Sequence, residues 1–292
     1  MKIIFDLKTL QHELRNRGKV ALVPTMGNLH DGHLSLVKQG KECADTVVCT
    51  IFVNQSQFDE EADFVSYPRT LEDDLKKLER SKTDIAFVPS AELMYPNEQN
   101  FFIEVPGYIS KYLEGEFRGP FFSMVATIVM KFFFLIKPDI ALFGKKDYQQ
   151  AFMIKKLCAQ FSTGIVIVLG ETIRDFDGLA LSSRNAHLNS SVRPEANLMY
   201  EILIDIRHKI LQSKESERFD LNFLNQLERN GESRLNSRGW QCDYVSIINK
   251  EVLLQPNYPK KEWKELIILA AARLSNVRLI DNIEIINSNN SL

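Results

Sequence analysis

Short apolar runs alternate with helix-like segments through the first half of this chain, and that alternation constrains the fold more than any other feature. The β-rich runs predict strands at residues 20–24, 46–53, 85–89, 140–143 and 165–169. Segments with helical periodicity begin near residues 33, 70, 121 and 147. Strands and helices in this order favour a parallel sheet wrapped by helices.

The pattern changes after about residue 175. Two helical patterns, 192–212 and 220–238, precede three short β-rich runs near Tyr244, Ile267 and Leu279. We therefore expect a smaller α+β domain after the sheet domain. The predicted boundaries are 1–175 for the first domain and 176–286 for the second, followed by a frayed polar tail, 287–292.

Composition excludes several classes of protein. A formal net charge of −2, with basic and acidic residues mixed, gives no reason to expect nucleic-acid binding. Asp6 and Lys8 interrupt the N-terminal apolar run, which argues against a secretory signal. The most apolar stretch, 125–136, contains Lys131 and is shorter than the roughly 20 residues that a membrane span needs. We therefore expect no membrane partner. The 4 cysteines have no zinc or redox spacing, which favours a cytoplasmic protein.

Residues 24–33, PTMGNLHDGH, leave a predicted strand, turn at two glycines and enter a helix. At such a turn a nucleotide phosphate can meet free backbone N–H groups and the positive end of a helix dipole. His30 and His33 are one helical turn apart, so both imidazoles can donate hydrogen bonds to the same phosphates. Gly32 leaves room for a ligand to approach the backbone. The alternatives are two surface histidines or a metal site, although no third ligand is obvious nearby.

Three further polar groups are candidates for the same site. Residues 144–147 follow a predicted strand and include a lysine pair suited to phosphate oxygens. Residues 181–185 combine two hydroxyls with a guanidinium that could clamp a triphosphate, and the amides of 54–57 could fix a hydroxylated substrate. The alternatives are solvated lysines, a helix cap and ordinary turn chemistry. If all four groups follow strands, they converge on one crevice.

Taken together, these motifs resemble those of the pantothenate synthetase (pantoate–β-alanine ligase) family, a branch of the nucleotidyltransferases with a His-x-Gly-His motif. The matching segments run in order along nearly the whole chain: PTMGNLHDGHLSLV, FVNQSQF, YPRTLEDDL, LEGEFR, PDIALFGKKDYQQ, TIRDFDGLALSSRN and RLIDNI. The resemblance implies a Rossmann-like first domain with a smaller domain closing over it. It implies that ATP and pantoate form pantoyl adenylate and pyrophosphate, and that β-alanine then displaces AMP to give pantothenate on the coenzyme A pathway. It also implies a Mg²⁺ requirement and a homodimer.

The resemblance assigns roles to individual positions, with His33 as proton donor to the leaving group. Catalytic roles fall on His30, His33, Lys146, Ser182, Ser183 and Arg184. ATP binding falls on Met26, Gly27, Asn28, Leu29, His30, Asp31, Gly32, His33, Gly144, Lys145, Lys146, Asp147, Ile173, Leu181, Ser182, Ser183 and Arg184. Binding of pantoate or β-alanine falls on Asn54, Gln57, Arg118 and Gln150. No protein ligand of the metal is assigned.

The chain departs from the family pattern at several of these segments. Gln55 replaces a proline, Lys145 replaces a glutamate, Phe121 replaces a histidine in a segment where the order of Gly and Pro is also reversed, and Leu181 replaces a methionine. Two further hypotheses therefore remain open: a ligase for another small hydroxy acid, and a non-catalytic ATP-binding relative. The joint retention of both histidines with the lysine and the Ser-Ser-Arg segment argues against the second.

Overall fold

The computed structural model describes residues 1–58 and 61–286, and the tail predicted at 287–292 lies outside the described residues. The chain divides into two compact units, Met1–Ile173 and Arg174–Leu292.

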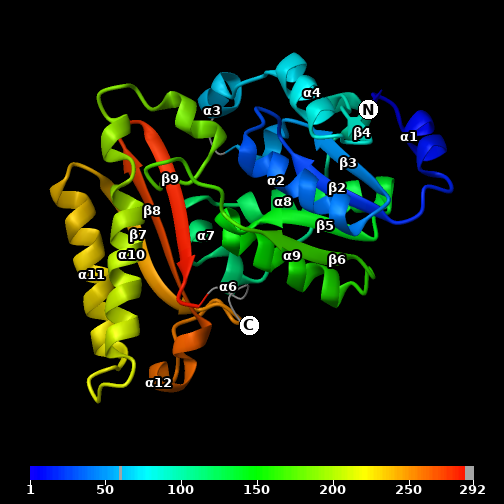
Figure 1. The fold of residues 1–292 in the computed structure, drawn as a ribbon. Coiled ribbons are helices and arrows are strands. Elements are labelled where there is room, and N and C mark those ends of the chain that lie inside the picture. The colour runs from blue at the N-terminus through cyan, green and yellow to red at the C-terminus, as the bar shows by residue number, and fades with distance from the viewer. Residues whose placement is uncertain (59–60, 287–292) are drawn as a thin grey trace. The chain divides into compact units, whose positions relative to one another are not determined.

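The first unit contains a parallel sheet, which confirms the predicted fold class (Figure 1). Its strands are β1 (Lys2–Ile4), β2 (Val20–Thr25), β3 (Thr46–Ile51), β4 (Ile85–Phe87), β5 (Ile140–Gly144) and β6 (Val166–Gly170). They lie in the order β1-β4-β3-β2-β5-β6, and each neighbouring pair is parallel. The central strands β2 and β3 are almost wholly buried, as continuous apolar runs in a parallel sheet require.

Helices cover both faces of this sheet (Figure 1). They are α1 (Leu7–Leu14), α2 (Asp31–Cys43), α3 (Glu61–Ser66), α4 (Leu71–Arg80), α5 (Ala91–Met94), α6 (Gly107–Ser110), α7 (Glu114–Phe117), α8 (Phe121–Ile136) and α9 (Tyr148–Gln160), with 3-10 turns η1 (Gln55–Gln57) and η2 (Lys145–Asp147). On one face, alternate strand residues such as Val23 and Cys49 pack against Val37 of α2 and Leu78 of α4. On the other face, Phe132 of α8 makes an edge contact with Phe52, and α8 contacts both α1 and α9.

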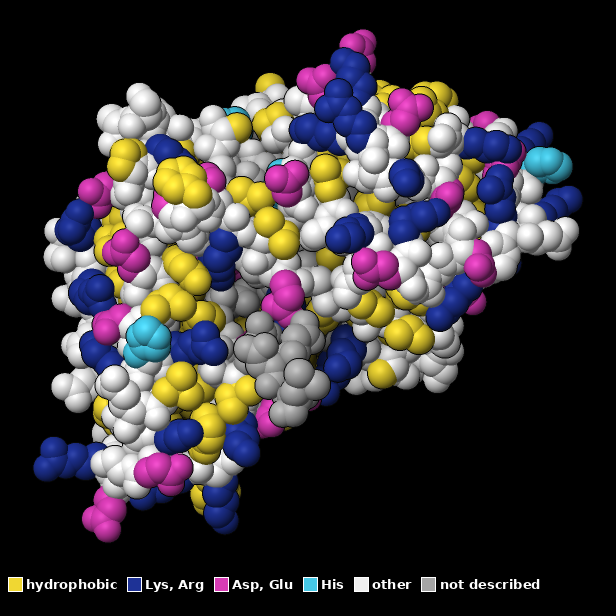
Figure 2. Space-filling model, viewed as in Figure 1, with side chains coloured by type: hydrophobic (Ala, Val, Ile, Leu, Met, Phe, Trp, Pro, Cys, Tyr) yellow, Lys and Arg dark blue, Asp and Glu magenta, His cyan; other side chains and the backbone are white. Residues whose placement is uncertain are grey.

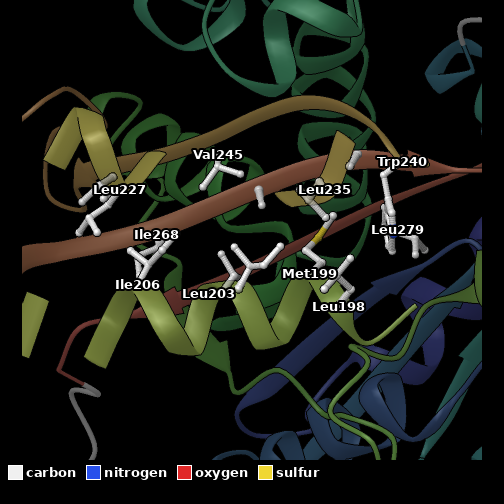
Figure 3. Close-up of a cluster of buried hydrophobic side chains, with 14 of the residues drawn as sticks. Leu198, Met199, Leu203, Ile206, Leu227, Leu235, Trp240, Val245, Ile268 and Leu279 are labelled. Atoms are coloured by element: carbon white, nitrogen blue, oxygen red, sulfur yellow. The ribbon is translucent and has the colours of Figure 1, made fainter. Parts of the chain in front are cut away.

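The second unit contains η3 (Ser183–His187), η4 (Arg193–Glu195), α10 (Leu198–Ser213), α11 (Leu221–Ser237), β7 (Gln241–Asn249), α12 (Pro259–Glu262), η5 (Trp263–Glu265), β8 (Leu266–Leu274) and β9 (Val277–Glu284). It is an α+β layer in which two helices lie against a three-stranded antiparallel sheet of order β7-β8-β9. Leu203 and Ile206 of α10 and Leu227 of α11 enter its apolar core, and Val245 and Ile268 of the sheet face them (Figure 3). This is the smaller domain that the sequence predicts.

Basic and acidic side chains are interspersed over the face shown in Figure 2, and no large single-sign patch stands out there. Within the described ranges, no helix is long and apolar enough to cross a membrane. The apolar stretch at 125–136 lies inside α8, where it is largely buried against the first unit's own core.

Candidate active site

Three of the four predicted polar groups follow neighbouring strands of the parallel sheet. The group around Asn54 follows β3, the histidine turn follows β2, and residues 144–147 close β5. The chain runs from β2 outward to β3 and β4, then returns to place β5 on the other side of β2. Ligands of open α/β sheets bind at the carboxyl edge, beside such a reversal of strand order. The first unit therefore brings these three groups to the edge where a ligand is expected.

The two histidines cap the first turn of α2 reciprocally. His30 is the N-cap residue, and its Nδ1 accepts a hydrogen bond from the backbone N–H of Gly32 at 3.1 Å. His33 lies three residues on, and its Nδ1 accepts from the backbone N–H of His30 at 3.3 Å. The rings lie against each other with centroids 4.1 Å apart. Two imidazoles thus take the places that Ser or Thr and Glu occupy in an ordinary capping box.

This cap fixes the tautomer of both rings. A nitrogen that accepts from an N–H carries no proton, so in the neutral imidazole the proton lies on Nε2. Burial, together with the charge of Lys146, lowers the pKa of His30 to about 4. Burial, with His30 and Lys146 beside it, lowers the pKa of His33 to about 3. Both rings are therefore neutral at pH 7, and each presents an Nε2–H that donates to no described residue.

Gly32 is required by the His30 ring rather than by its own backbone conformation. A Cβ built at Gly32 would lie 2.8 Å from Cε1 and 2.9 Å from Nδ1 of His30, closer than side chains tolerate. Any other residue at this position would displace the ring. The glycine of the His-x-Gly-His turn thus leaves the room that the ring of the first histidine needs.

The backbone of the histidine turn differs from the sequence expectation in one respect. Most of its N–H groups do not face outward as free donors, because they are bonded within the unit. The N–H groups of Asn28 and Leu29 donate to the carboxylate of Asp74, at 2.8 and 2.7 Å. Those of Gly32 and His30 donate to the two imidazoles. A phosphate at this turn would therefore meet mainly side-chain donors.

The β5 end contributes a lysine and an open stretch of backbone. A Cβ at Gly144 would meet no heavy atom within 4 Å, so the backbone there borders open space. Lys146 is among the causes that lower the pKa of both histidines, which places its charge near the two rings. Lys145, the replacement for a family glutamate, is buried and forms an ion pair of 2.7 Å with Glu171. Its added charge is thus compensated within the unit.

The β3 end holds a buried amide with a donor to spare. The Oδ1 of Asn54 accepts from the hydroxyls of Tyr95, at 2.8 Å, and Ser56, at 3.1 Å. Its Nδ2 is buried and donates to no described residue. The 3-10 turn that carries Gln57 forms with Gln55 in the place of proline. An unpaired buried donor is costly, so this Nδ2 is suited to donate to a ligand oxygen.

Arg118 lies beside Gln57 in the same unit. Its guanidinium is stacked over the ring of Phe121, 3.4 Å from the ring centroid, and its Nη2 donates to the backbone oxygen of Gln57 at 3.5 Å. The phenylalanine that replaces the family histidine therefore packs on the arginine rather than leaving it loose.

The two glutamines of α9 have different surroundings. Gln149 is buried and connects α9 to residues 109–114, since its Nε2 donates to the carbonyls of Ile109 and Tyr112 and its Oε1 accepts from the N–H of Glu114. Gln150 is half-buried and hydrogen-bonds to no described residue. Of the two, Gln150 has polar atoms available for a ligand. Gln149 is not singled out by the sequence, because adjacent glutamines look alike without knowledge of which one faces the core.

The fourth polar group, 181–185, belongs to the second unit and follows no strand of the parallel sheet. Ser182 caps η3, its Oγ accepting from the N–H of Arg184 at 3.2 Å. Arg174, at the start of this unit, holds the segment by a bidentate ion pair with Asp281. Ile173 is the last residue of the first unit. Three of the four groups therefore follow strands of the parallel sheet, as the sequence predicts, and the fourth does not.

Family membership is decided by comparison with known proteins. The sequence model of the pantoate–β-alanine ligase family matches residues 1–284. The chain belongs to the pantoate–β-alanine ligase family. It is accordingly an enzyme that condenses pantoate with β-alanine at the expense of ATP.

Solved structures agree with this assignment. The chain is similar to pantothenate synthetase from Thermus thermophilus, with a TM-score of 0.89, 34% identity, and coverage of 98% of this chain and 100% of that one. It is similar to pantoate–β-alanine ligase from Francisella tularensis, with a TM-score of 0.80, 32% identity and 98% coverage of both chains. That ligase was solved in complex with β,γ-ATP and β-alanine. These comparisons confirm the fold, the activity and the family that the motifs predict.

Proposed function

We propose that this ligase works through a pantoyl adenylate and that the capped histidine pair binds the ATP phosphates. The observation that carries the proposal is the pair of Nε2–H donors, whose direction is fixed because both Nδ1 atoms are engaged in the helix cap. Phosphate oxygens are strong acceptors, and the start of α2 adds the positive end of its dipole. Lys146 supplies a nearby positive charge that adds to the effect of burial in lowering the pKa of both rings.

The reaction that fits these donors has two steps. A carboxylate oxygen of pantoate attacks the α-phosphorus of ATP, and the bond from that phosphorus to the bridging oxygen breaks, so that pyrophosphate leaves. The amine of β-alanine then attacks the acyl carbon and AMP departs with the electron pair, giving the amide. Negative charge grows on the leaving pyrophosphate in the first step, and fixed N–H donors stabilise such charge without reorganising.

A pKa of about 3 makes His33 a neutral hydrogen-bond donor at pH 7. An imidazolium would carry a proton on Nδ1, the atom that accepts from the N–H of His30, so the helix cap favours the neutral ring. We therefore assign His33 to the leaving pyrophosphate as a hydrogen-bond donor through Nε2–H, in place of the proton donor that the resemblance implies. His30 stabilises the same phosphates.

Pantoate and β-alanine are assigned to the carboxyl end of β3 and the first turn of α9. The buried Nδ2 of Asn54 and the available amide of Gln150 offer donors for the hydroxyl and carboxylate oxygens of pantoate. Gln57 is assigned to both substrates, and Arg118, placed on its backbone oxygen, supplies a positive charge for a carboxylate.

The remaining ATP contacts are assigned to Met26–Asp31 and Gly144–Asp147 in the first unit, with Ile173 toward the adenine. Leu181, Ser182, Ser183 and Arg184 of the second unit are assigned as a phosphate clamp. Two hydroxyls and a guanidinium suit triphosphate oxygens.

Mg²⁺ is proposed to bind through the phosphates of ATP. In the part of the chain that the structure describes, no group of three or more His, Cys, Asp or Glu side chains is arranged to hold an ion. Mg²⁺ commonly keeps several waters and binds substrate phosphates rather than an all-protein cage, so the phosphate oxygens of ATP suit it as ligands. When bound, Mg²⁺ would neutralise phosphate charge. We also propose a cytoplasmic homodimer, and the free thiols of all 4 cysteines accord with a reducing compartment.

The test is a pyrophosphate-release assay in which ATP, pantoate and β-alanine are omitted in turn. Pyrophosphate should appear with ATP and pantoate alone, and AMP should accompany it stoichiometrically once β-alanine is present. His33→Ala should lower the rate by about 100-fold or more, the usual cost of one transition-state donor. His12→Ala, which removes an exposed histidine of α1, is the matched control and should behave as wild type. Equal pyrophosphate release without pantoate, or full activity of His33→Ala, would contradict the mechanism.

A further inference from the structure

Asp74 is a buried carboxylate that the reaction itself does not use. It lies on α4, in the sequence Glu72-Asp73-Asp74, and only 1% of its surface is exposed. A buried carboxylate is costly unless it is well bonded, so its partners indicate why it is there.

Among the described residues, two of the three hydrogen-bond donors to Asp74 belong to the histidine turn. Its Oδ2 accepts from the backbone N–H of Asn28 at 2.8 Å, and its Oδ1 accepts from the backbone N–H of Leu29 at 2.7 Å. The Thr70 hydroxyl, at the start of α4, donates to the same Oδ2 at 3.1 Å. One side chain, 46 and 45 residues away in sequence, thus fixes the two peptide groups that lead into His30.

The backbone of the turn adapts to this carboxylate. Asn28 adopts φ of 49°, in the left-handed region, and Gly27 adopts φ of 80°. A Cβ at Gly27 would lie 3.1 Å from Oδ2 of Asp74 and 3.2 Å from Ile51. Since non-glycine residues enter the left-handed region at a cost, the bonds to Asp74 must compensate for the conformation of Asn28.

Lys77 adds a second connection between α4 and the turn. Its Nζ donates to the backbone oxygen of Leu29 at 2.7 Å. Asp74 and Lys77 are one helical turn apart, so α4 holds both the N–H and the C=O of Leu29. The charge of Lys77 also contributes to the lowered pKa of both imidazoles, which places it on the histidine side of α4.

We propose that Asp74 is a positioning residue that sets the place of His30 and His33 relative to the ATP phosphates. This inference rests on the proposed phosphate-binding role of the histidines. Asp74 holds the peptides that precede the N-cap residue, and the N-cap residue carries the first imidazole. A shift of those peptides would move both Nε2–H donors together, since each ring is bonded to the backbone of the same turn. Binding of ATP should suffer before binding of pantoate or β-alanine does.

Asp74→Asn is the most informative variant, because it keeps size and shape but turns one acceptor oxygen into an N–H₂ group facing a backbone N–H. We expect the KM and the Kd for ATP to rise about 10- to 100-fold, the scale associated with misplacing a binding group by around 1 Å. The KM values for pantoate and β-alanine should stay near those of wild type. Asp73→Asn, which changes the exposed neighbour that pairs with Lys76, is the matched control and should leave all three values unchanged.

A merely structural Asp74 would give a different pattern. It would lower the melting temperature of the full chain and leave the substrate constants alone when they are measured well below melting. If Asp74→Asn fails to fold, Lys77→Met still removes the bond to the Leu29 oxygen and should raise the KM for ATP selectively. Unchanged ATP constants in whichever variant folds would overturn the proposal. So would a variant whose only defect is a higher Mg²⁺ requirement.

The positioning role of Asp74 and the phosphate-binding role of the histidines can fail separately. If His30→Ala and His33→Ala bind and use ATP as wild type does, the phosphate-binding role of the histidines is wrong and the role of Asp74 falls with it. If the histidine variants are impaired while Asp74→Asn binds ATP normally, only the positioning role is wrong.

Discussion

Replacing Gly32 by alanine should separate stability from activity in this enzyme. The added Cβ would lie 2.8 Å from the His30 ring, which must retreat to the ordinary contact distance of 3.4 Å or more. The ring cannot move without weakening the bond that its Nδ1 accepts from the N–H of residue 32, at 3.1 Å in the native turn. The substitution therefore acts on the orientation of the Nε2–H donor and on the cap of α2 at once.

The expected effect on stability is small because two contributions oppose each other. Alanine in place of glycine within a helix stabilises by about 0.5–1 kcal/mol. Loss of an N-cap hydrogen bond costs about 1 kcal/mol. The free energy of unfolding should therefore stay within about 1 kcal/mol of wild type. Displacement of the ring by a fraction of an ångström, in contrast, should lower kcat/KM for ATP by about 10-fold or more.

Pyrophosphate release and urea unfolding, measured on the same preparation, test this separation. Gly40→Ala is the control, because Gly40 lies in the same helix but faces Val47 and Leu142 of the core. That variant should change stability, if anything, and leave kcat/KM unchanged. Wild-type activity in Gly32→Ala would refute the steric argument, and a loss of activity matched by global unfolding would show that the cap, not the donor, dominates.

Three other predictions concern charge. The pKa values of His30 and His33 in the folded chain, about 4 and about 3, lie below the ordinary 6.5, so the unfolded chain binds more protons in this range. The free energy of unfolding, measured by denaturant titration, should therefore be highest above pH 6.5 and fall as the pH drops toward 4. It should fall less in the variant with glutamine at both positions. Burial raises the pKa of Glu228 from 4.5 to about 7, so the folded chain binds more protons between these pH values and its stability should decline as the pH rises through them. Glu228→Gln should therefore raise the free energy of unfolding by about 1–3 kcal/mol at pH 8 and change it little at pH 4. Arg174→Ala removes two hydrogen bonds to the buried carboxylate of Asp281 and should destabilise the second unit by about 3 kcal/mol. Both tryptophans lie in the second unit, so their fluorescence follows the unfolding of the Glu228 and Arg174 variants. A stability that does not change with pH would contradict the first two predictions, and an unshifted unfolding transition of Arg174→Ala would contradict the third.

The elements that the sequence predicts are those with strong, long patterns. The buried strands β2, β3 and β5 and the helices α8, α10 and α11 are all found, with ends close to the predicted ones except at the start of α10, which lies at Leu198 rather than at 192. The missed elements are short or lie at an edge. β1 has three residues and pairs only with β4, and its run MKIIF is too brief to separate a strand from a coil. Helix α1 could have been inferred from Asp6, which caps it by accepting from the N–H of Thr9.

The site shows a different limit of sequence reasoning. Motif spacing places the histidines, Lys146 and Gln57 at strand ends, but it does not tell which charges are already paired. The partner of Lys145 is Glu171, 26 residues away, and no local pattern connects them. Asp74 had a detectable signal, since it lies three residues after Leu71 and four before Leu78, on the apolar stripe of α4. A carboxylate at a core position requires donors, and here the donors come from the histidine turn.

The histidine turn also explains why this position needs imidazole. An aspartate or serine can cap α2 but offers no N–H toward a phosphate, and a lysine can donate but cannot accept the backbone hydrogen bond that closes the cap. Imidazole has one nitrogen for each task, at opposite sides of a rigid ring. Because Nδ1 is held by the backbone of the same turn, the direction of Nε2–H is set by folding rather than by the arrival of ATP. The neutral state, maintained by burial, keeps Nδ1 able to accept, so the low pKa of each ring preserves the geometry that the proposed recognition of phosphate requires.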